Sequence, residues 1–158
     1  MPDHELDPLA AFSPATREWF RRAFEAPTEA QAGAWPAIAS GEHVLLAAPT
    51  GSGKTLAAFL WAIDKLAAEP TRPRGISLVY VSPLKALSYD VDRNLTVPLR
   101  GIGAELTVAV RSGDTPQRER QAMLRKAPDI LIHSRVPVSD ADRALAGAVR
   151  AHALLHRR

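Results

Sequence analysis

Residues 48–55 read Ala-Pro-Thr-Gly-Ser-Gly-Lys-Thr, and this stretch decides the fold. An apolar run at 43–47 precedes it and predicts a β-strand, and an Ala/Leu-rich pattern at 54–68 follows and predicts a helix. A Gly-rich loop between a strand and a helix is the context in which such a motif holds phosphate. Ala48 stands where the motif template has Gly, and the rest of the template matches. The alternative is an exposed Gly/Ser turn with a chance lysine, but the flanking patterns favour a phosphate-binding loop.

The residue types in this loop suit a nucleoside triphosphate. Gly51 and Gly53 leave the backbone free to curl around an anion with its N–H groups turned inward. The N-terminus of the following helix adds the positive end of its dipole. Lys54 can reach the β- and γ-phosphates, and the hydroxyl of Thr55 can hold Mg²⁺. We expect Lys54 also to serve in catalysis and Thr55 to bind the metal. The residues expected to bind nucleotide in this loop are Thr50, Gly51, Ser52, Gly53, Lys54 and Thr55.

Length and composition are those of an ordinary globular chain. A length of 158 residues is enough for one domain with its own core. The absence of cysteine excludes disulfides, thiolate metal sites and cysteine nucleophiles. No apolar run approaches the roughly 20 residues that span a bilayer, and the N-terminus lacks the basic and apolar regions of a signal peptide. We therefore expect a cytoplasmic protein without a membrane partner. The formal net charge of +3 fits an anionic partner, but only weakly.

Along the chain, β-rich runs alternate with helical patterns. Residues 1–13 are polar and irregular and predict a loose arm. Such alternation predicts an α/β fold with a parallel sheet flanked by helices on both faces. The strands are expected at 43–47, 76–81, 107–110 and 128–132, and the helices at 14–24, 28–40, 54–68, 84–94 and 116–125. The connection at 70–75 holds two prolines and a glycine, which forbid regular structure there.

A candidate adenine site lies about twenty residues before the phosphate loop. The side chain of Gln31 offers one acceptor and two donors, which pairing with the edge of an adenine requires. The ring of Phe24 could stack on the face of the base. Taken alone, the segment at 27–31 would be a plain helix start with Thr28 as its cap, but its position before the loop favours nucleotide recognition.

Two further segments, residues 82–87 and 112–115, follow the ends of predicted strands. The ends of the strands form the edge at which open α/β sheets bind ligands. Each segment could hold the backbone of a nucleic-acid strand at a helix N-terminus. The alternatives are a Pro-initiated helix with a solvent-facing lysine in the first segment and a helix cap at Thr115 in the second. The basic helix at 116–126 is expected to be a solvated face. The candidate contacts to nucleic acid are Ser82, Pro83, Lys85, Gly113, Asp114 and Thr115.

These segments occur in the order and spacing of superfamily 2 helicases. The sequences of residues 27–38, 55–62 and 80–87 resemble those of the large helicase-related family of DEAD/DEAH-box proteins, and the resemblance covers residues 10–132. It implies a RecA-like domain that binds ATP and Mg²⁺ and contacts single- or double-stranded nucleic acid, with DNA favoured over RNA. In that family a second RecA-like domain completes the motor. A non-hydrolysing, nucleotide-dependent binding module is the alternative, and a P-loop kinase is less well supported.

The resemblance breaks after residue 132, which makes 14–132 the expected N-terminal part of a truncated RecA-like domain. The family pattern would continue with Thr-Thr-Pro-Glu-Ser-Leu and reach an Asp-Glu-x-His box, whereas 133–158 diverge and contain no such box. Codons that the genetic code permits for 133–142, read one base later, give Thr-Pro-Glu-Ser-Leu-Tyr-Leu-Met-Leu. One hypothesis is therefore that 133–158 are out of frame; the other is a genuine Ala/Arg-rich helix. Without the box, the chain is not expected to be an active motor by itself.

Overall fold

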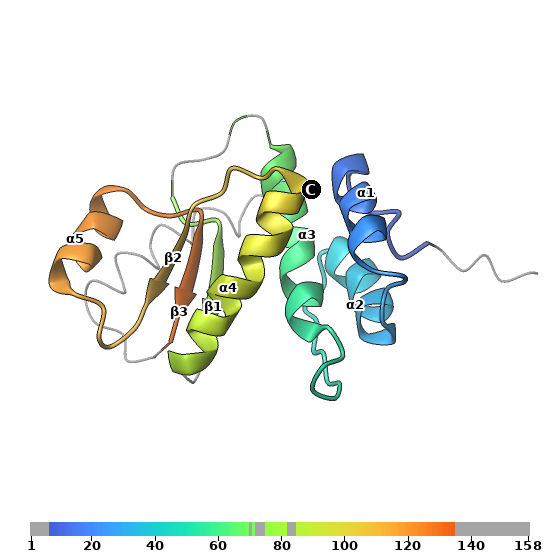
Figure 1. Ribbon diagram of the computed structural model, residues 1–158, viewed down its shortest axis with the longest axis horizontal. Helices are drawn as coiled ribbons and strands as arrows, with labels where there is room; N and C mark the ends of the chain where they lie inside the picture. Colours follow the sequence, from blue (N-terminus) through green and yellow to red (C-terminus); the bar gives the residue numbers. More distant parts are fainter. Residues whose placement is uncertain (1–6, 70, 72–74, 82–84, 135–158) are drawn as a thin grey trace, which may run out of the picture. The chain divides into compact units, whose positions relative to one another are not determined.

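The fold is seen in a computed structural model of the chain (Figure 1). It describes residues 7–69, 71, 75–81 and 85–134, with only the backbone described for residues 85–87. The chain forms two compact units. The first comprises Met1–Ala68 with Arg100–Ala104, and the second comprises Glu69–Leu99 with Glu105–Arg158.

The first unit is helical. It contains α1 (Pro14–Ala23), α2 (Glu29–Ala39) and α3 (Lys54–Ala68), as the sequence predicts. Ser13 caps α1, its side chain accepting from the backbone N–H of Thr16, and Pro14 occupies the first turn, where a missing N–H costs nothing. Thr28 caps α2 in a full capping box with Gln31, so that two orphan N–H groups are satisfied reciprocally.

The core of this unit is aromatic and includes part of the expected N-terminal arm. Its buried members are Leu9, Phe12, Trp19, Phe20, Trp35 and Leu60. The ring of Phe12 packs edge-on against that of Trp35 with 4.9 Å between centroids. The expectation of a loose arm is therefore wrong for residues 7–13, because burying Leu9 and Phe12 holds that segment in place; residues 1–6 lie outside the described part.

A buried carboxylate and its neighbour tie the N-terminal segment to α3. Asp64, 1% exposed, accepts from the backbone N–H of Ser13 at 3.0 Å. Lys65 donates from Nζ to the carbonyl of Ala11 at 3.1 Å and lies 4.0 Å from the ring centroid of Trp61. The helix that follows the phosphate loop is thus fixed to the segment that precedes α1.

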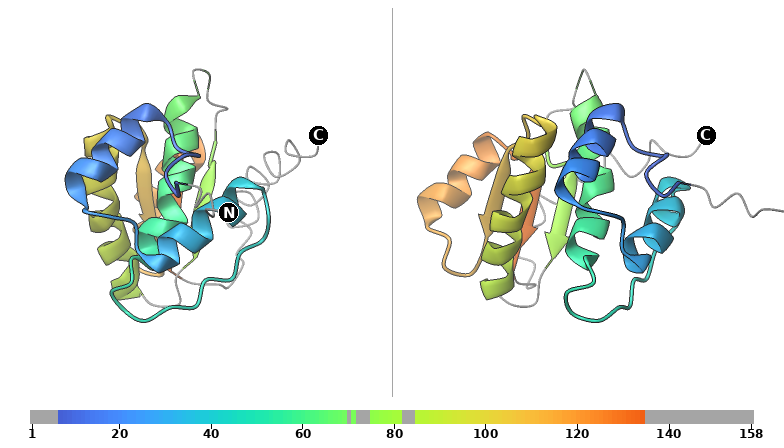
Figure 2. Two further views of the ribbon diagram at one scale, coloured as in Figure 1. Left: turned by 90° about the vertical axis from the view of Figure 1, so that its right-hand side faces the viewer. Right: turned by 45° about the vertical axis from the view of Figure 1, so that its right-hand side comes forward.

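The second unit contains a parallel sheet. Its strands are β1 (Leu78–Val81), β2 (Val108–Arg111) and β3 (Ile130–His133), in the order β1-β3-β2. Val81 and Arg111 both pair with His133, so the three strands end together at one edge. Helices α4 (Lys85–Ile102) and α5 (Gln117–Arg125) lie on opposite faces of the sheet (Figures 1 and 2). The α/β fold with a parallel sheet flanked by helices is confirmed, as are three of the four predicted strands.

The prediction of a strand at 43–47 is wrong. Residues 42–49 have no regular secondary structure, and the side chain of Leu45 is 96% exposed. A strand is stabilised by the ladder it forms with a neighbour, and the strands of the described sheet pair only with one another. The apolar pattern is typical of a strand, but residues 43–47 have no pairing partner in the described structure and therefore do not form one.

Helix α4 is longer than the 84–94 predicted. It continues to Ile102 through Pro98. Val91, Leu95 and Leu99 are all buried and recur at the spacing of one helix face. Burial of this face offsets the cost of an internal proline, which is about 3 kcal/mol.

Candidate nucleotide site and nucleic-acid contacts

The phosphate loop adopts the backbone that its glycines permit. Gly51 has φ +84° and Gly53 has φ +78°, both in the left-handed region that side chains disfavour. A Cβ at Gly53 would lie 2.4 Å from Nε2 of Gln31, whereas one at Gly51 would meet nothing within 4 Å. The left-handed backbone thus favours glycine at both positions. At Gly53 the neighbouring side chain of Gln31 also leaves no space for a Cβ atom.

Lys54 lies within the loop, at the first residue of α3. Its ammonium donates to the carbonyl of Pro49 at 2.6 Å and also to that of Ala48. Thr55 is exposed on the first turn of the same helix. The structure therefore places the lysine and the hydroxyl expected to meet phosphate and Mg²⁺ next to each other at a helix N-terminus, where the dipole favours an anion. In the loop that precedes Lys54, Thr50 is exposed and Ser52 is half-buried.

The α2 capping box is bonded to the phosphate loop. Thr28 donates from its hydroxyl to the carbonyl of Ser52 at 2.8 Å, and Gln31 donates from Nε2 to the carbonyl of Gly53 at 3.3 Å. Oε1 of Gln31 accepts from the backbone N–H of Thr28 at 3.0 Å. Gln31 is only 4% exposed. Its amide thus serves as a link between the start of α2 and the loop, and its reading of adenine remains a prediction.

Phe24 lies at the end of α1, partly open to solvent. Its ring is 4.8 Å from that of Phe20 and 5.8 Å from that of Trp19, measured between centroids. The residue is nevertheless 42% exposed. The aromatic core supports one part of the ring, and the exposed part is what stacking on a base would use.

Of the two segments expected to contact nucleic acid, one is described. Ser82 and Pro83 lie outside the described residues, and Lys85 begins α4 with only its backbone described. In the other segment, Gly113 and Asp114 are exposed just beyond β2. Thr115 is 9% exposed, and its hydroxyl accepts from the backbone N–H of Ser112 at 2.8 Å. Thr115 therefore closes the loop internally, which leaves Gly113 and Asp114 as its accessible tip.

Sequence reasoning missed Arg120. The expectation that the basic helix is a solvated face is wrong for this residue, which is half-buried and donates to three carbonyls of the loop before it. The signal in the sequence is an arginine in the first turns of a helix that follows a Ser-Gly-Asp-Thr turn. The contact itself needs the tertiary course of the loop, which the pattern does not give.

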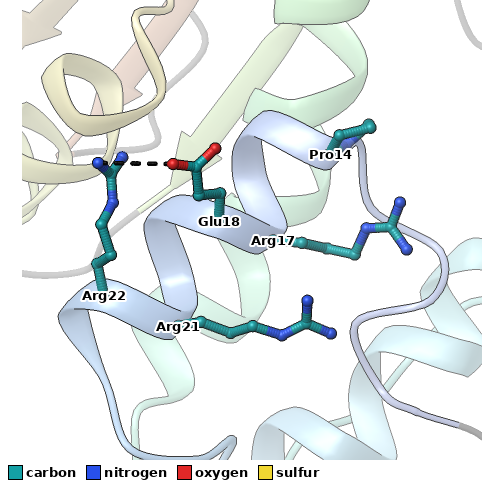
Figure 3. A pocket seen from close by; sticks show the side chains of 5 residues that line it. All are labelled: Pro14, Arg17, Glu18, Arg21 and Arg22. Atoms are coloured by element: carbon teal, nitrogen blue, oxygen red, sulfur yellow. Dashed lines mark ion pairs between the residues drawn. The ribbon is translucent and has the colours of Figure 1, made fainter.

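A shallow hollow on α1, with a volume of about 470 Å³, carries several charged groups (Figure 3). It is lined by Pro14, Arg17, Glu18, Arg21 and Arg22. Glu18 pairs with Arg22 at 3.7 Å, and Arg21 pairs with Asp7 at 3.2 Å. Two of the three arginines thus already have carboxylate partners, and none of the residues predicted to bind nucleotide lines this hollow.

Comparison with known proteins places these features in a family. The family model described as DEAD/DEAH box helicase matches residues 28–146. Within the described residues, no helix is long and apolar enough to cross a membrane.

Similar full-length proteins are much longer than this chain. It is 55% identical over 143 residues to the Lhr helicase/probable uracil glycosylase of Mycolicibacterium smegmatis, covering 84% of this chain and 10% of that protein. It is 50% identical over 138 residues to the Lhr helicase/uracil glycosylase of Escherichia coli, covering 77% and 9%. The chain thus spans about a tenth of the length of these relatives.

A solved structure agrees with this match. The structure of Mycobacterium smegmatis helicase Lhr bound to ssDNA and AMP-PNP superposes with a TM-score of 0.76 at 57% identity, over 80% of this chain and 17% of that chain. The phosphate loop, the parallel sheet and the family match over most of the sequence agree: the chain belongs to the DEAD/DEAH box helicase family.

Proposed function

We propose that this chain is the ATP-binding and nucleic-acid-contacting portion of an Lhr-type ATP-dependent helicase, and that it does not act as a motor by itself. The observation that carries the proposal is the loop at 50–55, with two left-handed glycines and a lysine at the start of α3. The similar helicase Lhr of known structure was captured with AMP-PNP and ssDNA, which supports the proposed binding of nucleotide and of nucleic acid.

The nucleotide site uses groups of the first unit. The backbone N–H groups of the loop and the N-terminus of α3 hold the phosphates, and Lys54 neutralises charge on the β- and γ-phosphates. To do so, its ammonium exchanges the carbonyls of Ala48 and Pro49 for phosphate oxygens. Thr55 supplies a hydroxyl to the Mg²⁺ that accompanies ATP, and Phe24 and Gln31 contact the adenine.

The nucleic-acid contacts lie at the carboxyl ends of the strands. The loop Ser112–Thr115 follows β2 at the edge where the three strands end, and residues 82–85 come directly after β1 in the sequence. Ligands of open α/β sheets bind outside this edge. Single-stranded DNA is the ligand we assign to it, with RNA as the alternative that the same backbone contacts would accept.

Substitution of Lys54 tests the nucleotide site. The chain is titrated with a fluorescent, non-hydrolysable ATP analogue in the presence of Mg²⁺. Lys54→Ala removes the cation that contacts the phosphates, and we expect a loss of affinity of at least about tenfold, since hydrogen bonds to charged groups contribute about 1.5–3 kcal/mol. The matched control is Lys126→Ala, which removes the same charge from an exposed position after α5.

Equal affinities for the two lysine variants would contradict the assignment. To exclude misfolding, both variants are compared with the parent chain by far-UV circular dichroism and urea unfolding. A parent chain that does not bind the analogue at all would also overturn the proposed nucleotide site.

A further inference from the structure

Arg120 holds the loop after β2 from the helix that follows that loop. Its Nε donates to the carbonyl of Thr115 at 2.8 Å, and its Nη2 donates to the carbonyls of Gly113 at 2.7 Å and Ser112 at 3.3 Å. A guanidinium presents its N–H groups in a rigid planar fork. One side chain therefore engages three carbonyls within four consecutive residues, of which that of Ser112 also accepts from the backbone N–H of Thr115 at 3.2 Å.

The inner side of the loop is closed by its own hydroxyl groups. The N–H of Ser112 donates to Oγ1 of Thr115 at 2.8 Å, and the N–H of Asp114 donates to Oγ of Ser112 at 3.3 Å. Ser112 and Thr115 are buried, whereas Gly113 and Asp114 are exposed. The loop is thus a fixed turn whose only accessible part is its tip.

The direction of these carbonyls matters for an anionic ligand. A carbonyl oxygen carries partial negative charge and repels a phosphate that approaches it. Because Arg120 draws three carbonyls toward α5, they do not point from the tip toward an approaching strand. A loop fixed before binding also loses less conformational entropy when the ligand arrives.

We propose that Arg120 is a positioning residue for nucleic-acid binding, which orients the loop Ser112–Thr115 so that its tip can contact the strand. This inference rests on the proposed function, which assigns that loop to nucleic acid. Arg120 does not serve as a phosphate ligand, because three of its five N–H donors are already engaged with the loop. Arg118, on the same helix, is exposed and carries the same charge.

The test compares these two arginines in the full 158-residue chain. Affinity for fluorescein-labelled oligo-dT is measured by anisotropy at several salt concentrations. Arg120→Ala is expected to weaken binding about tenfold, the equivalent of about 1.4 kcal/mol, without changing the slope of log affinity against log salt. Arg118→Ala is expected to leave the affinity largely unchanged. Arg120→Lys keeps the charge but not the fork, and is expected to weaken binding nearly as much as Arg120→Ala.

Amide hydrogen exchange without DNA tests the clamp independently of the ligand. In Arg120→Ala the amides of Ser112 and Thr115 are expected to exchange faster, while those of β3 and α3 exchange as in the parent chain. Retained protection of β3 and α3 separates loss of the clamp from general unfolding. Affinity for the fluorescent ATP analogue, which the first unit binds, is expected to stay unchanged.

Each other outcome overturns the inference in a recognisable way. Unchanged exchange at Ser112 and Thr115 shows that no clamp exists. Faster exchange with unchanged oligo-dT affinity shows that the loop is not the contact, which is a failure of the proposed function, as is a parent chain that does not bind oligo-dT. A salt slope lowered by about 0.7 in Arg120→Ala assigns a direct phosphate contact, and full affinity in Arg120→Lys shows that charge alone matters.

Discussion

Gly53 shows how one residue links two parts of the nucleotide site. Its φ of +78° suits glycine, and the space that a side chain would occupy is filled by the amide of Gln31. Gly51 shares the left-handed conformation but has open space around it. The sequence predicts both glycines from the loop motif, whereas their difference depends on Gln31, which is 22 residues away along the chain.

Alanine substitution of the two glycines separates these effects. Gly51→Ala is expected to cost about 1–2 kcal/mol of stability, which is the strain of a left-handed alanine. Gly53→Ala bears the same strain and also displaces Gln31, so a further loss of about 1–3 kcal/mol and a lower affinity for the ATP analogue than in Gly51→Ala are expected. Urea unfolding and nucleotide titration measure the two quantities. Equal values for the two variants would show that the contact with Gln31 has no energetic weight.

At the scale of elements, the end of α4 is fixed by close packing that its own sequence does not reveal. A Cβ at Gly101 would lie 2.0 Å from Nε1 of Trp19, so the indole of α1 rests directly on the backbone of α4. The sequence predicts an end near Asn94, whereas the helix continues through Thr96, Val97 and Pro98, which are poor helix formers. Burial of Leu95 and Leu99 decides otherwise, and local propensity carries no information about that burial.

Two helical glycines provide a matched test of this packing. Gly33→Ala, in α2, has open space and gains helix propensity, so a stabilisation of about 0.5–1 kcal/mol is expected. Gly101→Ala gains the same propensity but must displace Trp19, and a net destabilisation of about 1–3 kcal/mol is expected. Chemical denaturation monitored by tryptophan fluorescence measures both. A stabilised Gly101→Ala variant would contradict the close packing of Trp19 on α4.

At the scale of the whole molecule, binding ATP and using it are different requirements. Phosphoryl transfer needs a carboxylate for Mg²⁺, a group that orients the attacking water and a cation that stabilises the transition state. The sequence contains the phosphate loop but no Asp-Glu-x-His box. The family resemblance implies that the box and a second RecA-like domain supply those groups.

The 158-residue chain is therefore expected to bind nucleotide without unwinding DNA. Strand separation is measured with a fluorophore–quencher duplex that carries a single-stranded overhang, and phosphate release is followed in parallel with and without oligo-dT. We expect no separation and no stimulation of phosphate release by oligo-dT. DNA-stimulated hydrolysis that Lys54→Ala abolishes would refute this expectation and show that the chain is a motor.

The nucleotide sequence tests whether residues 133–158 are read in the native frame. Residues 135–158 lie outside the described part of the structure, so the frame hypothesis and the boundary at 132 stay predictions. If reading one base later does not lead to an Asp-Glu-x-His box shortly downstream, the hypothesis fails. The genuine Ala/Arg-rich helix then becomes the better interpretation.

The sequence by itself determined the features whose signals are local. The phosphate loop, the caps Ser13 and Thr28 and three strands of the sheet follow from residue types and spacing within a few positions. The tertiary structure alone decided what depends on distant partners. The segment 43–47 is not a strand in the structure, because a strand needs a neighbour to pair with. Leu9 and Phe12 are held in place by an aromatic core. Arg120 donates hydrogen bonds to a loop instead of facing solvent. Local patterns set conformational preference, and only the folded chain shows which groups meet.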